Sequence, residues 1–228
     1  MRILLNDRMQ EMLSSDMSSV NNIKSPALSQ PLQIGALAGE VVIEWPYKIQ
    51  ADSIGIGGTD LPLSVQIDND GIWRKIDFNG SGLYIFSKEP LFFQKITIRS
   101  LSNFIDRIAV GRSIYIGTDV NKEITYKSSI KSKITLGGQI MPSYGGYMYR
   151  ELRLKSNYKI TQEIHNEIRD GYKWIGQGYP VFLDLSEEEY KLGFNKFYGY
   201  ENSNAALKLK SAPLKYLWTM DFNFVEAF

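Results

Sequence analysis

The chain has 228 residues, of which 43% are hydrophobic and 22% charged, a composition typical of a globular protein with enough apolar material for a core. Its 26 Lys and Arg residues nearly balance 25 Asp and Glu residues, which gives a net charge of +1. This balance excludes an overall positive potential that would attract nucleic acid or an anionic membrane. The absence of cysteine excludes disulfide scaffolds, thiolate zinc sites and cysteine nucleophiles.

The first 31 residues predict a short strand followed by an irregular arm. Ile3–Leu5 is apolar enough for the strand, whereas Asn6–Pro31 is polar and rich in turn-forming residues. Charged residues interrupt the apolar ones too often for a signal peptide, and no later run is long enough to cross a bilayer. We therefore expect synthesis and folding in a reducing cytoplasm, no membrane insertion, and an arm that wraps its own domain or reaches a neighbouring subunit.

Short apolar runs separated by turn residues fill the first half of the chain after this arm. A spacing of roughly 8–12 residues with Gly, Asn and Asp between the runs is typical of a β-sandwich or barrel. The clearest hairpin is Leu63–Phe78, with its turn at Asp68–Gly71. Lys95–Arg99 alternates polar and apolar residues, which places Ile96 and Ile98 on one face of a strand.

The polar, lysine-rich residues 119–138 predict a linker or an edge strand, where lysines discourage aggregation between sheets. One helix is expected beyond it, because apolar residues recur at helical spacing after the N-cap candidate Thr161. These residues are Ile164, Ile168, Tyr172 and Ile175. Strands are predicted at Leu152–Leu154, Tyr179–Leu185 and Leu217–Phe224. The fold class is therefore mostly β, with one main helix in the second half.

Four features could carry chemistry, and each has a simpler structural interpretation. His165 is the only histidine and has no cysteine partner, so it is interpreted as a structural or solvated residue of the helix. Asp68–Gly71 could bind calcium but also suits a hairpin turn. Ile54–Asp60 resembles a phosphate loop without its lysine and is better interpreted as a buried strand entering a loop. Glu187–Glu189 could supply an acid–base pair, but it more plausibly opens a short solvated helix after Ser186. We expect no catalytic, cofactor-binding or metal site.

Aromatic residues offer a different kind of site. Trp45, Tyr47, Trp73 and Tyr84 could form a platform on which sugars stack, if they are exposed. The alternative, which we favour, is that they pack in the core or at an interface, because aromatic side chains supply large buried area wherever sheets meet.

An ordered series of weak matches carries a resemblance to known proteins. The matches are Leu4–Leu5 with Ser14–Ser15, then Ala51–Gly58, Ser64–Ile67, Ile105–Arg112, Gly137–Gln139, Tyr144–Gly146, Arg150–Leu154, the helix, Gly178–Asp184 and the alternating C-terminal strand. In this order they resemble a class of phage virion proteins with an N-terminal discoidin-like (galactose-binding-like) jelly roll and a small α+β tail domain. The chain departs from sugar-binding members of the discoidin-like class, because no matching set of ligand-binding loop residues is identified.

The resemblance implies a jelly-roll β-sandwich with an N-terminal arm over residues 1–118, a linker or edge strand over 119–138, and a smaller α+β domain over 139–228. It also implies a structural component of a bacteriophage tail or baseplate: a ring, collar or adaptor subunit, or a fibre attachment point. The expected partners are other tail proteins and copies of the chain itself, and the expected location is the virion tail. The alternative is a carbohydrate-binding module for a host polysaccharide; a carboxylate-dependent depolymerase is a third hypothesis.

Overall fold

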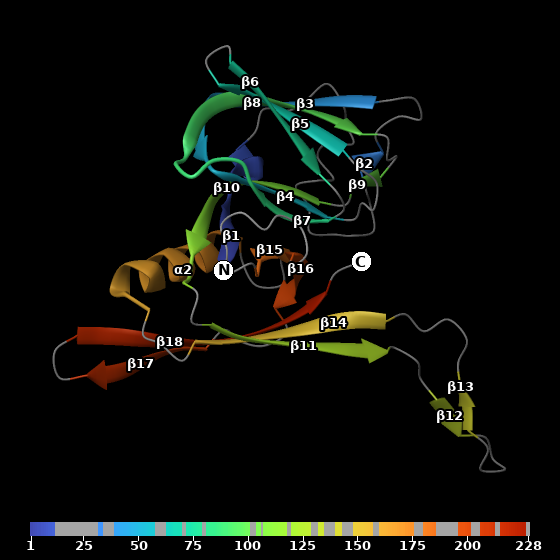
Figure 1. Cartoon of the computed structure of the whole chain (residues 1–228), viewed down its shortest axis with the longest axis vertical. Coiled ribbons are helices and arrows are strands. Elements are labelled where there is room, and N and C mark those ends of the chain that lie inside the picture. The colour runs from blue at the N-terminus through green and yellow to red at the C-terminus, as the bar shows by residue number, and fades with distance from the viewer. Residues whose placement is uncertain are drawn as a thin grey trace.

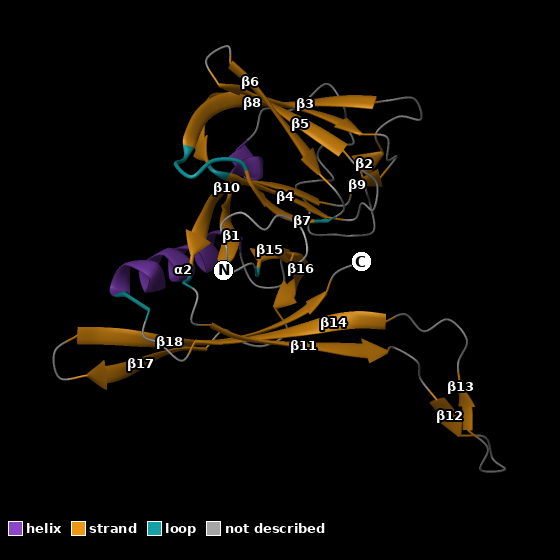
Figure 2. Ribbon diagram, in the orientation of Figure 1, coloured by secondary structure: helices purple, strands orange, loops and turns teal. Residues whose placement is uncertain are grey.

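The computed structural model describes residues 1–11, 32–33, 39–57, 63–69, 72–78, 81–100, 104–105, 107–117, 120–128, 132–134, 140–142, 148–156, 160–175, 180–185, 196–201, 206–212 and 215–226. Within these ranges the chain is mostly β and contains one α-helix, as the sequence predicts (Figures 1 and 2).

The strands form one large sheet, one sheet of medium size and two short ribbons. The ten-stranded sheet runs in the order β11 (Val120–Ser128), β14 (Met148–Ser156), β18 (Lys215–Glu226), β16 (Lys196–Glu201), β15 (Pro180–Asp184), β1 (Arg2–Asp7), β10 (Arg107–Tyr115), β4 (Ser53–Gly57) and β7 (Gly82–Ile85), with β17 (Ala206–Ala212) also paired to β18. The four-stranded sheet runs β3 (Gly39–Ala51), β8 (Leu91–Ser100), β5 (Leu63–Asn69) and β6 (Ile72–Phe78). The ribbons are β2 (Leu32–Gln33) with β9 (Phe104–Ile105), and β12 (Ser132–Ile134) with β13 (Ile140–Pro142). The helical elements are the 3₁₀ turn η1 (Arg8–Glu11) and α2 (Gln162–Ile175).

A first core lies between the four-stranded sheet and the β4–β10 part of the large sheet (Figure 1). The predicted hairpin is confirmed as β5 and β6, in a register that runs from Leu63 opposite Phe78 to Asn69 opposite Ile72. Ile96 and Ile98 of β8 both enter this core, as their alternation predicts. Ile54 and Ile56 of β4 face them from the large sheet, so the glycine-rich segment here is a buried strand and residues 58–60 lie outside the described residues.

Residues 1–11 are built into the fold, and the prediction of an arm from Asn6 onward is wrong for residues 6–11. The strand β1 extends to Asp7, and Met9 in η1 is fully buried in the first core. Two partners hold this segment: Asp7 pairs with Arg107, and the Trp45 indole donates a hydrogen bond of 2.7 Å to the carbonyl of Arg8. The rest of the expected arm, residues 12–31, lies outside the described residues. Contacts with residues distant in sequence thus order a polar segment.

A second core lies beneath α2, which packs on β1 and β18. The predicted helix is confirmed, and the backbone N–H of Ile164 donates to the hydroxyl of Thr161 at 3.4 Å, as expected for an N-cap. Ile168 is fully buried, and Ile164 and Tyr172 pack against the same core. Gly171 allows the close approach, because a Cβ there would lie 2.6 Å from the Cβ of Leu5.

Between these two cores the large sheet curls, so that β7 contacts β15 and β16. A small third cluster fills the curl and contains Leu4, Leu83, Ala109, Phe182 and Tyr198. The Phe182 and Tyr198 rings stack at 4.6 Å, against the glycine positions of β4. A Cβ at Gly55 would meet the Phe182 ring at 2.3 Å, and one at Gly57 would meet the Tyr198 ring at 2.6 Å. Glycine is therefore required for this packing rather than for a loop.

A long platform is made of β11, β14, β17 and β18, and side chains of β11, β14 and β18 form part of the second core (Figure 1). The C-terminal strand is confirmed and is longer than predicted, as is the strand around Leu152–Leu154. The position near residue 118 separates β10 from β11, yet the large sheet runs through both halves of the chain. Strand β1 joins them, because it pairs with β10 on one side and with β15 on the other.

Candidate functional site

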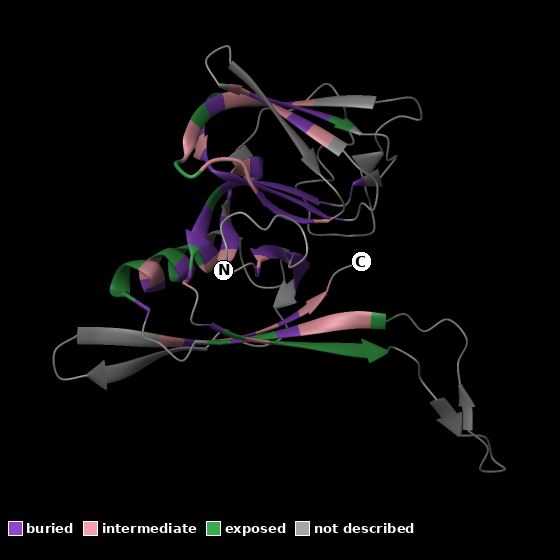
Figure 3. Ribbon diagram, viewed as in Figure 1, coloured by how far each residue is buried: buried purple, intermediate pink, exposed green. Residues whose placement is uncertain are grey.

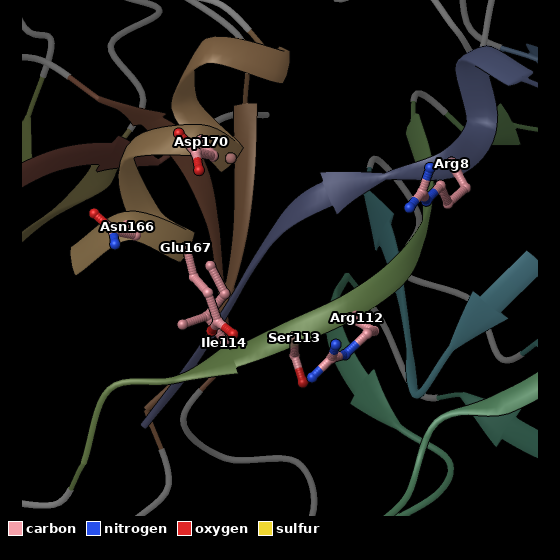
Figure 4. Close-up of a pocket in the computed structure, with 8 residues that line it drawn as sticks. Arg8, Arg112, Ser113, Ile114, Asn166, Glu167 and Asp170 are labelled. Carbon is pink, nitrogen blue, oxygen red and sulfur yellow. The ribbon is translucent and has the colours of Figure 1, made fainter. Parts of the chain in front are cut away.

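A cleft of about 390 Å³ lies between α2 and the second half of β10 (Figure 4). Arg8 and Arg112 line the wall formed by η1 and β10, and Glu167 and Asp170 line the wall formed by α2. Opposite charges thus occupy opposite walls of the cleft. A hydrogen bond from Arg169 holds the pKa of the Asp170 carboxyl below its usual value. This cleft could bind a group that carries both charges. The sequence did not point to it, since its walls lie far apart along the chain and each charge alone looks like ordinary surface.

A buried polar cluster adjoins this cleft at Ser113. Asp52 accepts hydrogen bonds from the backbone N–H of Ser113 at 2.8 Å and from the Ser113 hydroxyl at 2.9 Å, and it also contacts the hydroxyl of Ser53. Arg2 donates to the Ser113 hydroxyl at 3.2 Å and lies 4.0 Å from Asp52. The hydroxyl of Ser113 is thus directed to a carboxylate, without a histidine base in these contacts. The arrangement satisfies buried polar groups where β1, β4 and β10 meet.

The four aromatic residues named as a possible sugar platform are not equivalent. Trp45 is fully buried, with its ring edge-on to Phe93 at 6.0 Å, and Tyr84 is also buried, so core packing describes these two. Tyr47 is 52% exposed, at an irregularity in the β3–β8 register. The side chain of Trp73 lies outside the described residues.

The other sequence features also have definite places. His165 is buried on α2, within 3.3 Å of the side-chain amide of Gln162. Asp68 ends up in β5 opposite Trp73, while residues 70–71 and Glu187–Glu189 lie outside the described residues. The described residues contain no group of three or more His, Asp or Glu side chains placed to hold a metal ion. No helix in the described part of the chain is long and apolar enough to cross a membrane.

Burial causes a large change in the pKa of Lys196. Its side chain lies against Gly82, and its Nζ lies over the ring of Tyr84. Burial lowers the pKa of Lys196 to about 8, although the nearby Asp184 carboxylate acts in the opposite direction. At neutral pH the fold therefore carries a partly buried ammonium group at a cost in stability.

The pH dependence of stability should reveal this lysine. The unfolded chain keeps the ordinary lysine pKa, so between about pH 8 and 10 it binds more protons than the native state, and stability rises with pH there. After allowance for solvent screening, we expect a gain of about 1–2 kcal/mol between pH 7 and 9.5 in urea titrations. Lys196→Met should remove this gain. Parallel curves for the two proteins would contradict the assignment.

A second candidate surface is the strand that ends the large sheet among the residues that the structure describes, which we call the β11 edge (Val120–Ser128). Val120 at its start is buried in the second core, but two apolar side chains further along are open: Ile124 is 40% exposed and Tyr126 is 67% exposed. Met148 on the adjacent strand is 65% exposed. Figure 3 shows that most of β11 is exposed, in contrast to the buried strands above it. Alternation of apolar residues with charged ones in this lysine-rich segment is the signal in the sequence for such an edge.

Comparison with known protein families and with curated proteins gives no match for this chain.

Proposed function

We propose that this chain is a structural subunit of a bacteriophage tail or baseplate, a ring, collar or adaptor component that works through contacts with copies of itself and with other tail proteins. The observation that carries the proposal is the platform, whose strands continue past the second core and leave Ile124, Tyr126 and Met148 open. Exposed apolar side chains on a sheet edge favour contact with another protein. The same proposal implies that the protein is located in the virion tail.

The proposal includes the finer fold assignment. A jelly-roll, discoidin-like arrangement for residues 1–118 is supported by the antiparallel pairing of β3, β8, β5 and β6 and by the core they share with β4 and β10. In such an architecture the sandwich and the platform present separate surfaces. One subunit could therefore contact two kinds of neighbour.

Incorporation into phage particles tests this function. We expect the chain in purified virions, at a fixed number of copies per tail, when intact particles are analysed by quantitative mass spectrometry. Immunogold labelling should place it on the tail, because a structural subunit remains with the finished particle. Particles that lack the chain and remain infective would overturn the proposal.

Carbohydrate binding at the host surface is the alternative function, and one observation favours it. Tyr47 and Phe92 are 52% and 54% exposed on neighbouring strands of the four-stranded sheet, and open aromatic rings can stack on sugars. A glycan array should then give specific signals that Tyr47→Ala abolishes. An array without signals would remove this alternative.

A further inference from the structure

The β11 edge is a strand with one side unpaired among the residues that the structure describes. It ends the order of strands in the large sheet and pairs there only with β14. Alternate residues of such a strand direct their backbone N–H and C=O groups away from the sheet, where another strand can pair with them. The strand is nine residues long, which is ample for a ladder of hydrogen bonds with a second chain.

The two faces of β11 differ in chemistry. Ile124 lies on the face that continues the second core, because its register partner on β14 is the core residue Leu152. Tyr126, two residues further along the strand, lies on the same face. Glu123, Thr125 and Lys127 occupy the opposite, polar face. A partner strand must therefore cover apolar side chains on one face and match charges on the other.

We propose that the occupant is β11 of a second copy of this chain, paired antiparallel about a twofold axis at Thr125. Residues opposite each other in antiparallel strands share a face, so a twofold axis must lie at a residue. With the axis at Thr125, each Glu123 lies opposite Lys127 of the other copy, and each Ile124 lies opposite Tyr126. Both faces are then complementary, and two sheets become one.

Neighbouring registers fail on charge. An axis at Glu123 places two glutamates opposite each other, and an axis at Lys127 does the same with two lysines, which is unfavourable. An axis at Ile124 sets Lys122 against Tyr126, an axis at Tyr126 sets Thr125 against Lys127, and neither register contains an opposite-charge pair. The charges on this edge thus discourage irregular association and favour the register centred on Thr125.

Ion pairs within one copy arrange the charges of the polar face in an order that suits this register. Asp221 pairs with Arg153 at 3.4 Å, and Arg153 lies directly opposite Glu123 across the β11–β14 pair. On the same face Lys127 pairs with Glu151 at 2.6 Å. In the dimer the signs alternate without a break: Asp221, Arg153 and Glu123 of one copy meet Lys127 and Glu151 of the other. The charge order of the polar face is what singles out a second copy rather than an unrelated strand.

Single-cysteine variants test the register, since the chain has no cysteine of its own. Cysteines that face each other across a twofold axis lie within the Cα separation that a disulfide requires. On mild oxidation Thr125→Cys should give at least fivefold more crosslinked dimer than Ile124→Cys or Tyr126→Cys, and Lys173→Cys on α2 serves as a collision control. A maximum at another position, or yields equal to the control, would overturn the proposed register.

Charge reversal gives an independent test. Glu123→Lys and Lys127→Glu should each reduce self-association at least tenfold in sedimentation velocity, because each places like charges opposite each other. An equimolar mixture of the two variants should recover dimers, since the lysine introduced in one chain then faces the glutamate introduced in the other. Circular dichroism of each variant establishes that it is folded. A mixture that stays as monomeric as its components would contradict the pairing.

This inference rests on the proposed function only in assuming that copies of the chain meet. A chain that enters virions yet shows no Thr125 crosslink would overturn the β11 pairing and leave the tail function standing. A chain that dimerises through β11 but is absent from virions would support the pairing and overturn the tail function.

Discussion

Asp7→Ala is expected to lower the free energy of unfolding by about 3–5 kcal/mol, because it removes the carboxylate partner of a buried guanidinium. Asp7 lies 2.7 Å from Arg107, and both side chains are almost completely buried. The same carboxylate accepts hydrogen bonds from the backbone N–H groups of Met9 at 2.9 Å and Val110 at 3.1 Å. Removing it leaves three donors without this acceptor in a region that excludes water. Urea titration monitored by tryptophan fluorescence measures the loss.

Two controls separate the buried charge from general effects of truncation. Asp221→Ala removes a carboxylate from an exposed pair with Arg153, and we expect a much smaller loss because solvent screens this pair. The double variant Asp7→Ala/Arg107→Met removes both buried charges and should be less destabilised than the sum of its two single variants. A loss for Asp7→Ala as small as that for Asp221→Ala would show that the buried pair does not anchor residues 6–11.

Gly55→Ala should destabilise the protein by about 2–3 kcal/mol, which is large for a single added methyl group. The new Cβ would lie 2.3 Å from the Phe182 ring, closer than any ordinary contact, so either the ring or strand β4 must move. The ring has little room to do so, because it stacks on Tyr198 at 4.6 Å inside the curl of the sheet. Thermal and urea unfolding both report the change.

A smaller side chain opposite Gly55 should relieve this clash. Phe182→Leu alone costs stability because it leaves unfilled volume, but in its presence the added cost of Gly55→Ala should fall by at least half. The comparison forms a double-mutant cycle with four proteins and one kind of measurement. If Gly55→Ala costs the same in both backgrounds, close packing against Phe182 is not the reason that glycine stands there.

The parts of the fold that could be predicted are those fixed by local pattern. The β5–β6 hairpin has alternating residues on both strands and Asp70-Gly71 between them, and α2 has a cap and a 3.6-residue period. Each signal lies within one short stretch of sequence. Neighbouring residues therefore determine these elements before any tertiary contact forms.

The parts that were missed depend on contacts between distant segments. Residues 6–11 are mostly polar, and contacts with distant residues order them, among them the pairing of Asp7 with Arg107 and the burial of Met9. Trp45 stands beside a proline in a segment that could equally be exposed, and its burial depends on the carbonyl of Arg8 as a hydrogen-bond acceptor. Gly55 could be identified as part of a buried strand, but nothing nearby in sequence indicated that an aromatic ring would occupy the space above it.

Of the two candidate surfaces, one has a local signal in the sequence and the other depends on contacts between distant segments. The β11 edge has a signal in the sequence, because apolar Ile124 and Tyr126 alternate with charged residues, although the pattern alone cannot tell an open edge from a covered one. The cleft has no such signal. Arg8 and Arg112 line the same cleft as Glu167 and Asp170 because α2 packs across β1 and β10.

The central place of β1 has a consequence for biosynthesis. Its partners are Arg107–Tyr115 on one side and Pro180–Asp184 on the other, so β1 leaves the ribosome well before either strand that completes its hydrogen bonds. At translation rates of about 5–20 residues per second, the nascent strand waits on the order of ten seconds or more for its second neighbour. During that interval Ile3 and Leu5, fully buried in the finished protein, lack the β15 side of their core. Chaperones that hold exposed apolar segments would therefore have β1 as a target on the nascent chain during this interval.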